Sequence, residues 1–326
     1  MKVKKDGRYS SQQICLIGFI QSVFDHDTLL LKMIRLISQL LVLAIIAMVA
    51  SCAPNNLSIR LAYSRLDNVL YERLSSYANF NDDQLAWIEA ESKAYQLWHR
   101  QTELPDYADY FSEIASLVES GELLTTKDVE TLLVKLEYFS SRGYRHSPFA
   151  NSTEFLQQVS DMQVLEMYRY FDKRNAQWLQ HVQEQSNVLG NDERIDRLQA
   201  IFDRVGLSLN PQQRRILDKG FDRYAGQRED RIIAWTIWQK QFLIILEGRS
   251  SETFITRMQA HLDVYREQMK IQHPERSKKN KQIAIETVTD LLNSFTEIQR
   301  RQIVTTLRDS RDVLVSMAAS KQTTLL

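Results

Sequence analysis

The sequence is poor in glycine and proline and contains almost no cysteine. Of its 326 residues, 9 are Gly, 5 are Pro and 2 are Cys. Folds that turn every few residues depend on glycine and proline, so these low counts argue against β-sandwiches, propellers and glycine-looped nucleotide folds. Two cysteines exclude a disulfide-dense scaffold and a cysteine-rich zinc module.

An excess of charge is also absent. The chain has 41 basic and 41 acidic residues, so it has no surplus of positive charge with which to bind nucleic acid. We therefore expect no nucleic-acid partner.

The local patterns of common catalytic sites are missing. The sequence has no glycine-rich phosphate loop, no His-Glu-x-x-His and no Gly-x-Ser-x-Gly, which excludes the nucleotide sites, zinc proteases and serine hydrolases with those signatures. No two histidines stand four residues apart. We expect no catalytic residues, no metal site and no cofactor.

The strongest positive signal lies near the N-terminus. Residues 40–50 are eleven uncharged apolar residues, and Lys32 and Arg35 precede them. A basic segment, an apolar segment and small residues in this order predict a secretory signal. The alternative is an uncleaved transmembrane anchor over residues 36–53, which is just long enough to cross a bilayer.

The end of this segment, Val49-Ala50-Ser51-Cys52, resembles the lipobox of bacterial lipoproteins. The resemblance implies that Cys52 is acylated and becomes the first residue after cleavage. Because Ala53 and not Asp follows the cysteine, it also implies the outer membrane, with the protein facing the periplasm. The inner membrane is the alternative.

These signals divide the chain. We expect translation to start at Met33, with residues 1–32 a mis-assigned prefix, although a long N-terminal region is the alternative. We then expect a signal peptide over 33–51, the lipidated Cys52 and a short tether over 52–56, an all-helical periplasmic domain over 57–320, and a frayed tail over 321–326. Residues 53–56 would reach about 15 Å when extended, so the domain would lie close to the membrane.

The mature chain has apolar residues at helical spacing almost throughout. Capping residues predict helix starts at Asn81, Thr125 or Thr126, Asn210 and Thr296. The fold class is therefore all-α, a bundle of about ten helices joined by a loop at 140–152 and a basic surface turn at 277–281. We expect helices at 57–78, 81–101, 105–120, 126–139, 153–188, 191–205, 211–247, 251–272, 282–293 and 297–318.

Residues 61–110 carry a family resemblance. They contain Tyr-x-x-Leu-Asp, then Asn-x-x-Gln at a helix start, then Trp-His-Arg-x-x-Glu-Leu-Pro-x-Tyr-Ala. This order is similar to that of a family of Gram-negative lipoproteins known only as a domain of unknown function. The resemblance implies a secreted helical lipoprotein and supplies no catalytic residues.

A second resemblance concerns three helix starts of the form cap-x-x-Gln, at Asn81, Asn210 and Thr296. Small periplasmic helical chaperones of the Spy type carry Leu-Thr-x-x-Gln at helix starts. Plain helix capping requires the same residue types, so capping alone is the alternative explanation.

The densest part of the family resemblance is a candidate binding corner made of Trp98, His99, Arg100, Glu103 and Tyr107. We expect these residues at the end of one helix and across the turn into Pro105. Mixed aromatic, cationic and acidic groups are typical of binding surfaces. The structural alternative makes His99 a core histidine and pairs Glu103 with Arg100 or Arg65.

Two functions remain open. The first is a non-catalytic interaction or structural lipoprotein that binds an unknown envelope protein. The second is a carrier or chaperone that holds an apolar ligand or unfolded client between helices. The apolar stretch around Trp235 and Trp238 is a core helix in the first case and a lipid or peptide groove in the second.

Overall fold

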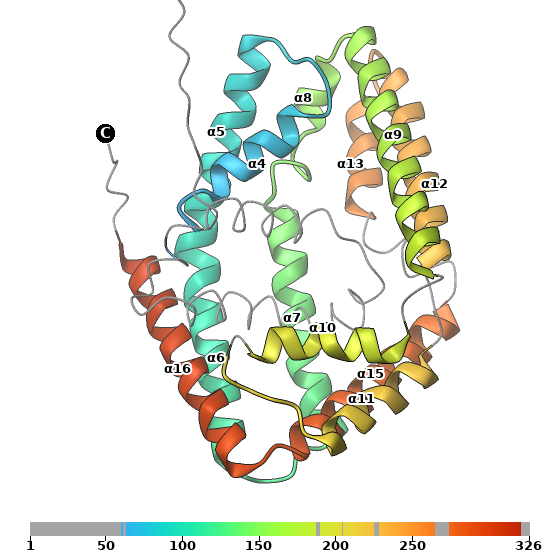
Figure 1. Cartoon of the computed structure of the whole chain (residues 1–326). Coiled ribbons are helices and arrows are strands. Elements are labelled where there is room, and N and C mark those ends of the chain that lie inside the picture. Colours follow the sequence, from blue (N-terminus) through green and yellow to red (C-terminus); the bar gives the residue numbers. More distant parts are fainter. Residues whose placement is uncertain are drawn as a thin grey trace, which may run out of the picture.

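The computed structural model describes residue 60 and residues 63–186, 190–203, 205–224, 228–264 and 274–320. Every regular element within these ranges is helical, and none is a strand (Figure 1), so the all-α prediction is confirmed. The lipobox, Cys52, the signal segment, the tether and the tail lie outside the described residues. The elements are α4 (Leu66–Ser75), α5 (Asp82–Trp98), the π-helix η1 (His99–Glu103), α6 (Leu104–Glu119), α7 (Thr126–Arg145), α8 (Thr153–Gln157), α9 (Asp161–Ser186), α10 (Asn191–Asp203), α11 (Pro211–Arg223), α12 (Arg228–Glu247), α13 (Phe254–Asp263), α15 (Pro274–Asn293) and α16 (Glu297–Ala319).

Several predicted boundaries are wrong. The expected loop at 140–152 begins later, because α7 continues to Arg145. The expected helix over 153–188 is two helices, because Ser160 caps the start of α9. The basic tract at 277–281 lies inside α15, where Asn280 is buried. None of the described helices is long and apolar enough to cross a membrane.

The predicted helix starts agree with the structure better than these boundaries do. Asn81, Thr125, Asn210 and Thr296 each accept a hydrogen bond from the backbone N–H three residues later and complete a capping box. Gly121, after α6, has a left-handed backbone with φ of 69°, a conformation that costs glycine little.

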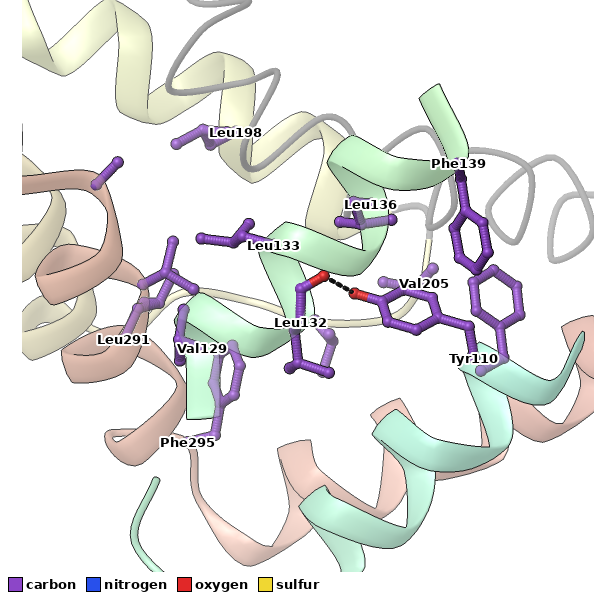
Figure 2. Close-up of a cluster of buried hydrophobic side chains, with 14 of the residues drawn as sticks. Tyr110, Val129, Leu132, Leu133, Leu136, Phe139, Leu198, Val205, Leu291 and Phe295 are labelled. Atoms are coloured by element: carbon purple, nitrogen blue, oxygen red, sulfur yellow. Dashed lines mark hydrogen bonds between the residues drawn. The ribbon is translucent and has the colours of Figure 1, made fainter. Parts of the chain in front are cut away.

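The buried side chains form two cores. The first joins α6, α7, α10, α11, α15 and α16, and the second joins α5, α8, α9, α12 and α13. Figure 2 shows part of the first core, where the Tyr110 hydroxyl donates to the Leu132 carbonyl oxygen at 3.0 Å. The second core has a counterpart, because the Trp238 indole N–H donates to the His261 carbonyl oxygen at 3.3 Å.

Four helices begin with the same sequence motif, an apolar residue, a capping residue and a glutamine three residues after the cap. The apolar residues are Phe80, Val159, Leu209 and Phe295, and all four are buried. The motif is Phe-Asn-x-x-Gln84, Val-Ser-x-x-Gln163, Leu-Asn-x-x-Gln213 and Phe-Thr-x-x-Gln299. Three of these starts are the predicted ones at Asn81, Asn210 and Thr296, whereas the start at Ser160 was not predicted.

The four glutamines join in two pairs. Gln84 and Gln163 exchange amide hydrogen bonds in both directions, at 3.2 and 2.7 Å. Gln213 and Gln299 do the same, at 2.9 and 3.1 Å. One pair therefore joins the starts of α5 and α9, and the other joins the starts of α11 and α16.

The arrangement is an internal duplication. We call residues 66–186 the N-terminal half and residues 191–319 the C-terminal half. The helix order in the two halves corresponds, with α5, α6 and α9 matching α11, α12 and α16. Helices of one half pack against helices of the other half. From the N-terminal half, α6 packs along α16 and α7 packs on α15. From the C-terminal half, α12 packs along α9 and α13 packs on α8. Tyr110 on α6 and Trp238 on α12 are equivalent residues.

Candidate functional site

The candidate corner lies on one uninterrupted helical segment. The expected turn into Pro105 is absent, because η1 joins α5 directly to α6 and places Pro105 in the first turn of α6. A π-helical turn inserts an extra residue into a helix, and such turns are frequent at functional sites. The structure brings all five predicted residues together around this turn.

Two aromatic contacts fix the start of the π-helix. The Trp98 ring stacks on the ring of His146, with centroids 4.0 Å apart and planes 7° apart. The His99 ring lies between Tyr95 and Tyr107, with centroid distances of 5.9 and 5.6 Å. Trp98 and His99 therefore pack against neighbouring rings.

His99 is neutral at physiological pH. Its Nδ1 lies 3.1 Å from the Tyr63 hydroxyl. Burial lowers the pKa of the imidazole to about 4, and the Arg142 guanidinium lowers it further by repelling the charged form. Burial also raises the pKa of the Tyr95 hydroxyl to about 12, so that group is neutral as well.

Glu103 is fully buried and pairs with Arg142. Arg142 Nε lies 2.5 Å from Glu103 Oε1, and Arg142 Nη2 lies 2.5 Å from Asp106 Oδ2. The predicted partners of Glu103, Arg100 and Arg65, are therefore wrong. Arg142 lies 39 residues away on α7, so no local spacing in the sequence could have indicated this ion pair.

Tyr63 connects the start of the described chain to this corner. Its carbonyl oxygen accepts from Gln96 Nε2 at 2.6 Å, and its ring lies 5.6 Å from the Arg100 guanidinium. Gln96 is buried. Burial raises the pKa of the Tyr63 hydroxyl above its usual range.

The corner suits a structural role better than a catalytic one. A substrate in solution cannot reach Glu103, because its carboxylate is fully buried. Among the described residues, Glu103 Oε2 and Arg100 Nε have no hydrogen-bond partner, and burying such atoms destabilises the fold unless other contacts compensate. The Arg142 ion pair and the ring contacts provide those contacts.

The apolar stretch around Trp235 and Trp238 is a core helix. Trp238 is fully buried and stacks on Trp235, with centroids 5.1 Å apart. A cavity of about 50 Å³ lies nearby, lined by aromatic and aliphatic side chains that include Trp87, Phe171 and Phe242. Binding pockets for small molecules usually measure about 300–1,000 Å³, so this cavity is too small for a lipid.

The outer surfaces of α9 and α12 are unusually apolar. Together they carry half of the fourteen large apolar side chains that are strongly exposed in the described chain. We call this set the α9–α12 apolar face. Its residues are Met162, Leu165, Tyr168, Leu179, Ile233, Ile237 and Ile244.

The repeated helix order allows the exposed positions of α12 to be compared with those of α6. Ile237 directly precedes Trp238, as Asp109 directly precedes the equivalent Tyr110. Ile244 follows Trp238 by six residues, as Ser116 follows Tyr110. All four side chains are exposed. At these two exposed positions the C-terminal half has isoleucine, whereas the N-terminal half has the polar residues Asp109 and Ser116.

Similarity to known proteins is limited to one family. The model of a family of unknown function, DUF6279, matches residues 76–273. The chain belongs to this family. The DUF6279 match covers most of the N-terminal half and continues through α13. No curated protein and no solved structure matches the chain.

Proposed function

We propose that this DUF6279 protein is a lipid-anchored protein of the cell envelope that works by binding a polypeptide partner, without catalysis. The proposed anchor is Cys52, acylated after cleavage of the signal segment and held in the outer membrane facing the periplasm. The lipobox string Val49-Ala50-Ser51-Cys52 supports this part. Two or more acyl chains would hold the protein firmly in the bilayer.

The observation that carries the binding role is the α9–α12 apolar face. Single exposed apolar residues are ordinary, whereas a concentration of them marks an interaction surface. Ile233, Ile237 and Ile244 are exposed on α12, whereas Trp238 on the same helix is buried. The polar residues at the equivalent positions of α6 support a role in binding, because folding alone does not select isoleucine there.

The anchor is tested through Cys52. We expect Cys52→Ala to abolish palmitate labelling and to leave the unprocessed precursor. Labelling that survives the substitution would contradict the anchor, and a cleaved but unlabelled protein would indicate an ordinary secretory signal.

The α9–α12 apolar face is tested by replacing two isoleucines of α12 with the residues found at the equivalent positions of α6. We expect the double variant Ile237→Asp, Ile244→Ser to lose partners captured by crosslinking in intact cells, with an unchanged melting temperature. The matched control is Val315→Ser on α16, another exposed apolar residue. Retention of every partner by the α12 variant would contradict this role for the face.

A second candidate is a chaperone that holds unfolded clients. The observation that favours it is the fourfold apolar-cap-x-x-Gln motif, which resembles the helix starts of Spy-type chaperones. A chaperone would suppress aggregation of several unrelated unfolded proteins, whereas a dedicated interaction protein would capture one partner. An aggregation assay with the same α12 variant separates the two.

A further inference from the structure

The segment that leads from the proposed anchor is fixed to one side of the folded domain. Arg60 Nη2 donates to Ser316 Oγ near the end of α16 at 2.6 Å. Three residues later, the Tyr63 hydroxyl donates to the Gln96 carbonyl oxygen at 3.3 Å. The chain therefore enters the domain between the end of α16 and the end of α5.

Chain length limits how far this entry point can lie from the membrane. Eight residue steps separate Cys52 from Arg60. At about 3.5 Å per residue, they span at most about 28 Å. An acylated Cys52 would therefore keep Arg60 within about 28 Å of the lipid surface, close enough for its side of the domain to touch the bilayer.

This side presents two exposed arginines. Arg60 and Arg65 are exposed, and among the described residues neither forms an ion pair with a carboxylate. Arg100 lies beside Tyr63 and adds a third guanidinium. Of the nearby acids, Asp312 pairs with Arg311 at 2.7 Å, and Asp67 is partly buried.

We propose that this side, defined by Arg60 and Arg65, lies against the bilayer and that its arginines bind the phosphate groups of anionic lipids. The proposal rests on the lipid anchor proposed above. Guanidinium groups form strong paired hydrogen bonds with phosphate, and an anionic membrane surface attracts basic residues close to it. In Figure 1, α16 lies on the left of the domain and the helices α9 and α12 lie on the right, so the proposed orientation places α9 and α12 on the side away from the bilayer.

The orientation is tested with single thiol labels on the mature lipoprotein. Acylation consumes Cys52, and Cys15 lies before the cleavage site, so an introduced cysteine is the only free thiol. A fluorophore is attached at Asn68→Cys, close to Arg65, or at Gln241→Cys on α12; both positions are exposed. In vesicles of phosphatidylethanolamine and phosphatidylglycerol, we expect a quencher on the lipid headgroups to quench the label at 68 strongly and the label at 241 weakly.

The role of the arginines is tested by removing their charge. We expect Arg60→Gln, Arg65→Gln to reduce quenching at 68 to the level at 241, while palmitate labelling and vesicle binding persist. Arg215→Gln, Arg301→Gln makes the same charge change at exposed sites elsewhere, and we expect no effect from it. Vesicles with phosphatidylcholine in place of phosphatidylglycerol should mimic the Arg60 and Arg65 variant.

The outcomes separate the two proposals. Loss of palmitate labelling and vesicle binding in the unaltered protein would overturn the lipid anchor. A protein that is labelled and bound, but shows equal quenching at 68 and 241, would overturn the orientation alone. Quenching at 68 that is insensitive to both arginines would overturn the assignment of phosphate binding to them.

Discussion

The side-chain amides of Gln213 and Gln299 hydrogen-bond to each other in both directions, at 2.9 and 3.1 Å. Each glutamine also accepts from the backbone N–H of its own capping residue, Asn210 or Thr296. Each donates in addition to a carbonyl beside the other helix, Gln213 to Ser294 and Gln299 to Ser208. Two helix starts are thus joined by one fully bonded pair.

Substitution of Gln299 should therefore destabilise the protein. Gln299→Leu removes the bonds that Gln299 makes to the Gln213 amide, the Thr296 N–H and the Ser208 carbonyl. Unsatisfied buried polar groups cost about 1–3 kcal/mol. We expect a lower free energy of unfolding in a denaturant titration. Gln302→Leu, at an exposed position on the same helix, is the control. Equal stability of the two variants would show that the pair contributes little.

Removal of Arg142 should be more damaging. Arg142→Met leaves the fully buried Glu103 without its ion pair, and breaking a buried pair from one side costs about 3–5 kcal/mol. We expect a large fall in the free energy of unfolding. The control Arg145→Met changes an exposed arginine on the same helix and should have little effect.

The double variant Arg142→Met, Glu103→Leu tests why Arg142→Met lowers the free energy of unfolding. Replacement of both members by apolar groups removes the uncompensated charge, so we expect it to recover much of the stability. A double variant as unstable as Arg142→Met would indicate that the loss comes from packing.

His99 should make stability depend on pH. Its pKa in the folded protein is lowered to about 4, whereas an unfolded histidine titrates near about 6.5. The neutral form is therefore favoured by folding, and its contribution is fully present above the unfolded pKa. It is lost as pH falls from about 6.5 towards 4, because the unfolded chain binds the proton first.

Thermal melts at about pH 7 and about pH 5 measure this effect. We expect the melting temperature of the unaltered protein to fall more between these two pH values than that of His99→Gln. Burial also lowers the pKa of His261, so some pH dependence should remain in the variant. An identical fall in both proteins would show that His99 does not contribute.

The contact between α11 and α15 predicts a steric effect at Gly220. A Cβ atom there would lie 2.5 Å from Thr287 Oγ1 and 2.6 Å from Thr287 Cγ2. Overpacking of this kind costs about 1–3 kcal/mol, so we expect Gly220→Ala to lower the melting temperature. Thr287→Ala in the same chain should restore part of it. Gly248→Ala, where the nearest atom is 3.5 Å away, is the control.

Local chemistry made part of this structure predictable. The caps at Asn81, Asn210 and Thr296 depend on residues three positions apart, and the structure has each of them. The continuous helix through Pro105 was not predictable in this way, because a proline normally ends or kinks a helix and the π-helical turn before it has no clear sequence signal.

Contacts between distant residues limited prediction of the candidate site. The grouping of His99, Glu103 and Tyr107 was predicted across a turn between two helices, whereas the structure places them on one continuous helical segment. The partners that determine their chemistry come from elsewhere, Arg142 from α7 and Tyr63 from the segment before α4. The apolar face was missed because its two helices are adjacent only in the folded chain.

The exchange of helices between the halves has a consequence for how the chain acquires its structure. During synthesis, α6 emerges long before α16, the helix that covers it. The N-terminal half alone therefore leaves an apolar surface open until almost the last residues are made, and α9 likewise waits for α12. Contacts this distant in sequence form slowly, and open apolar surface invites aggregation. We therefore expect folding to be completed in a single late event, after α16 has been made.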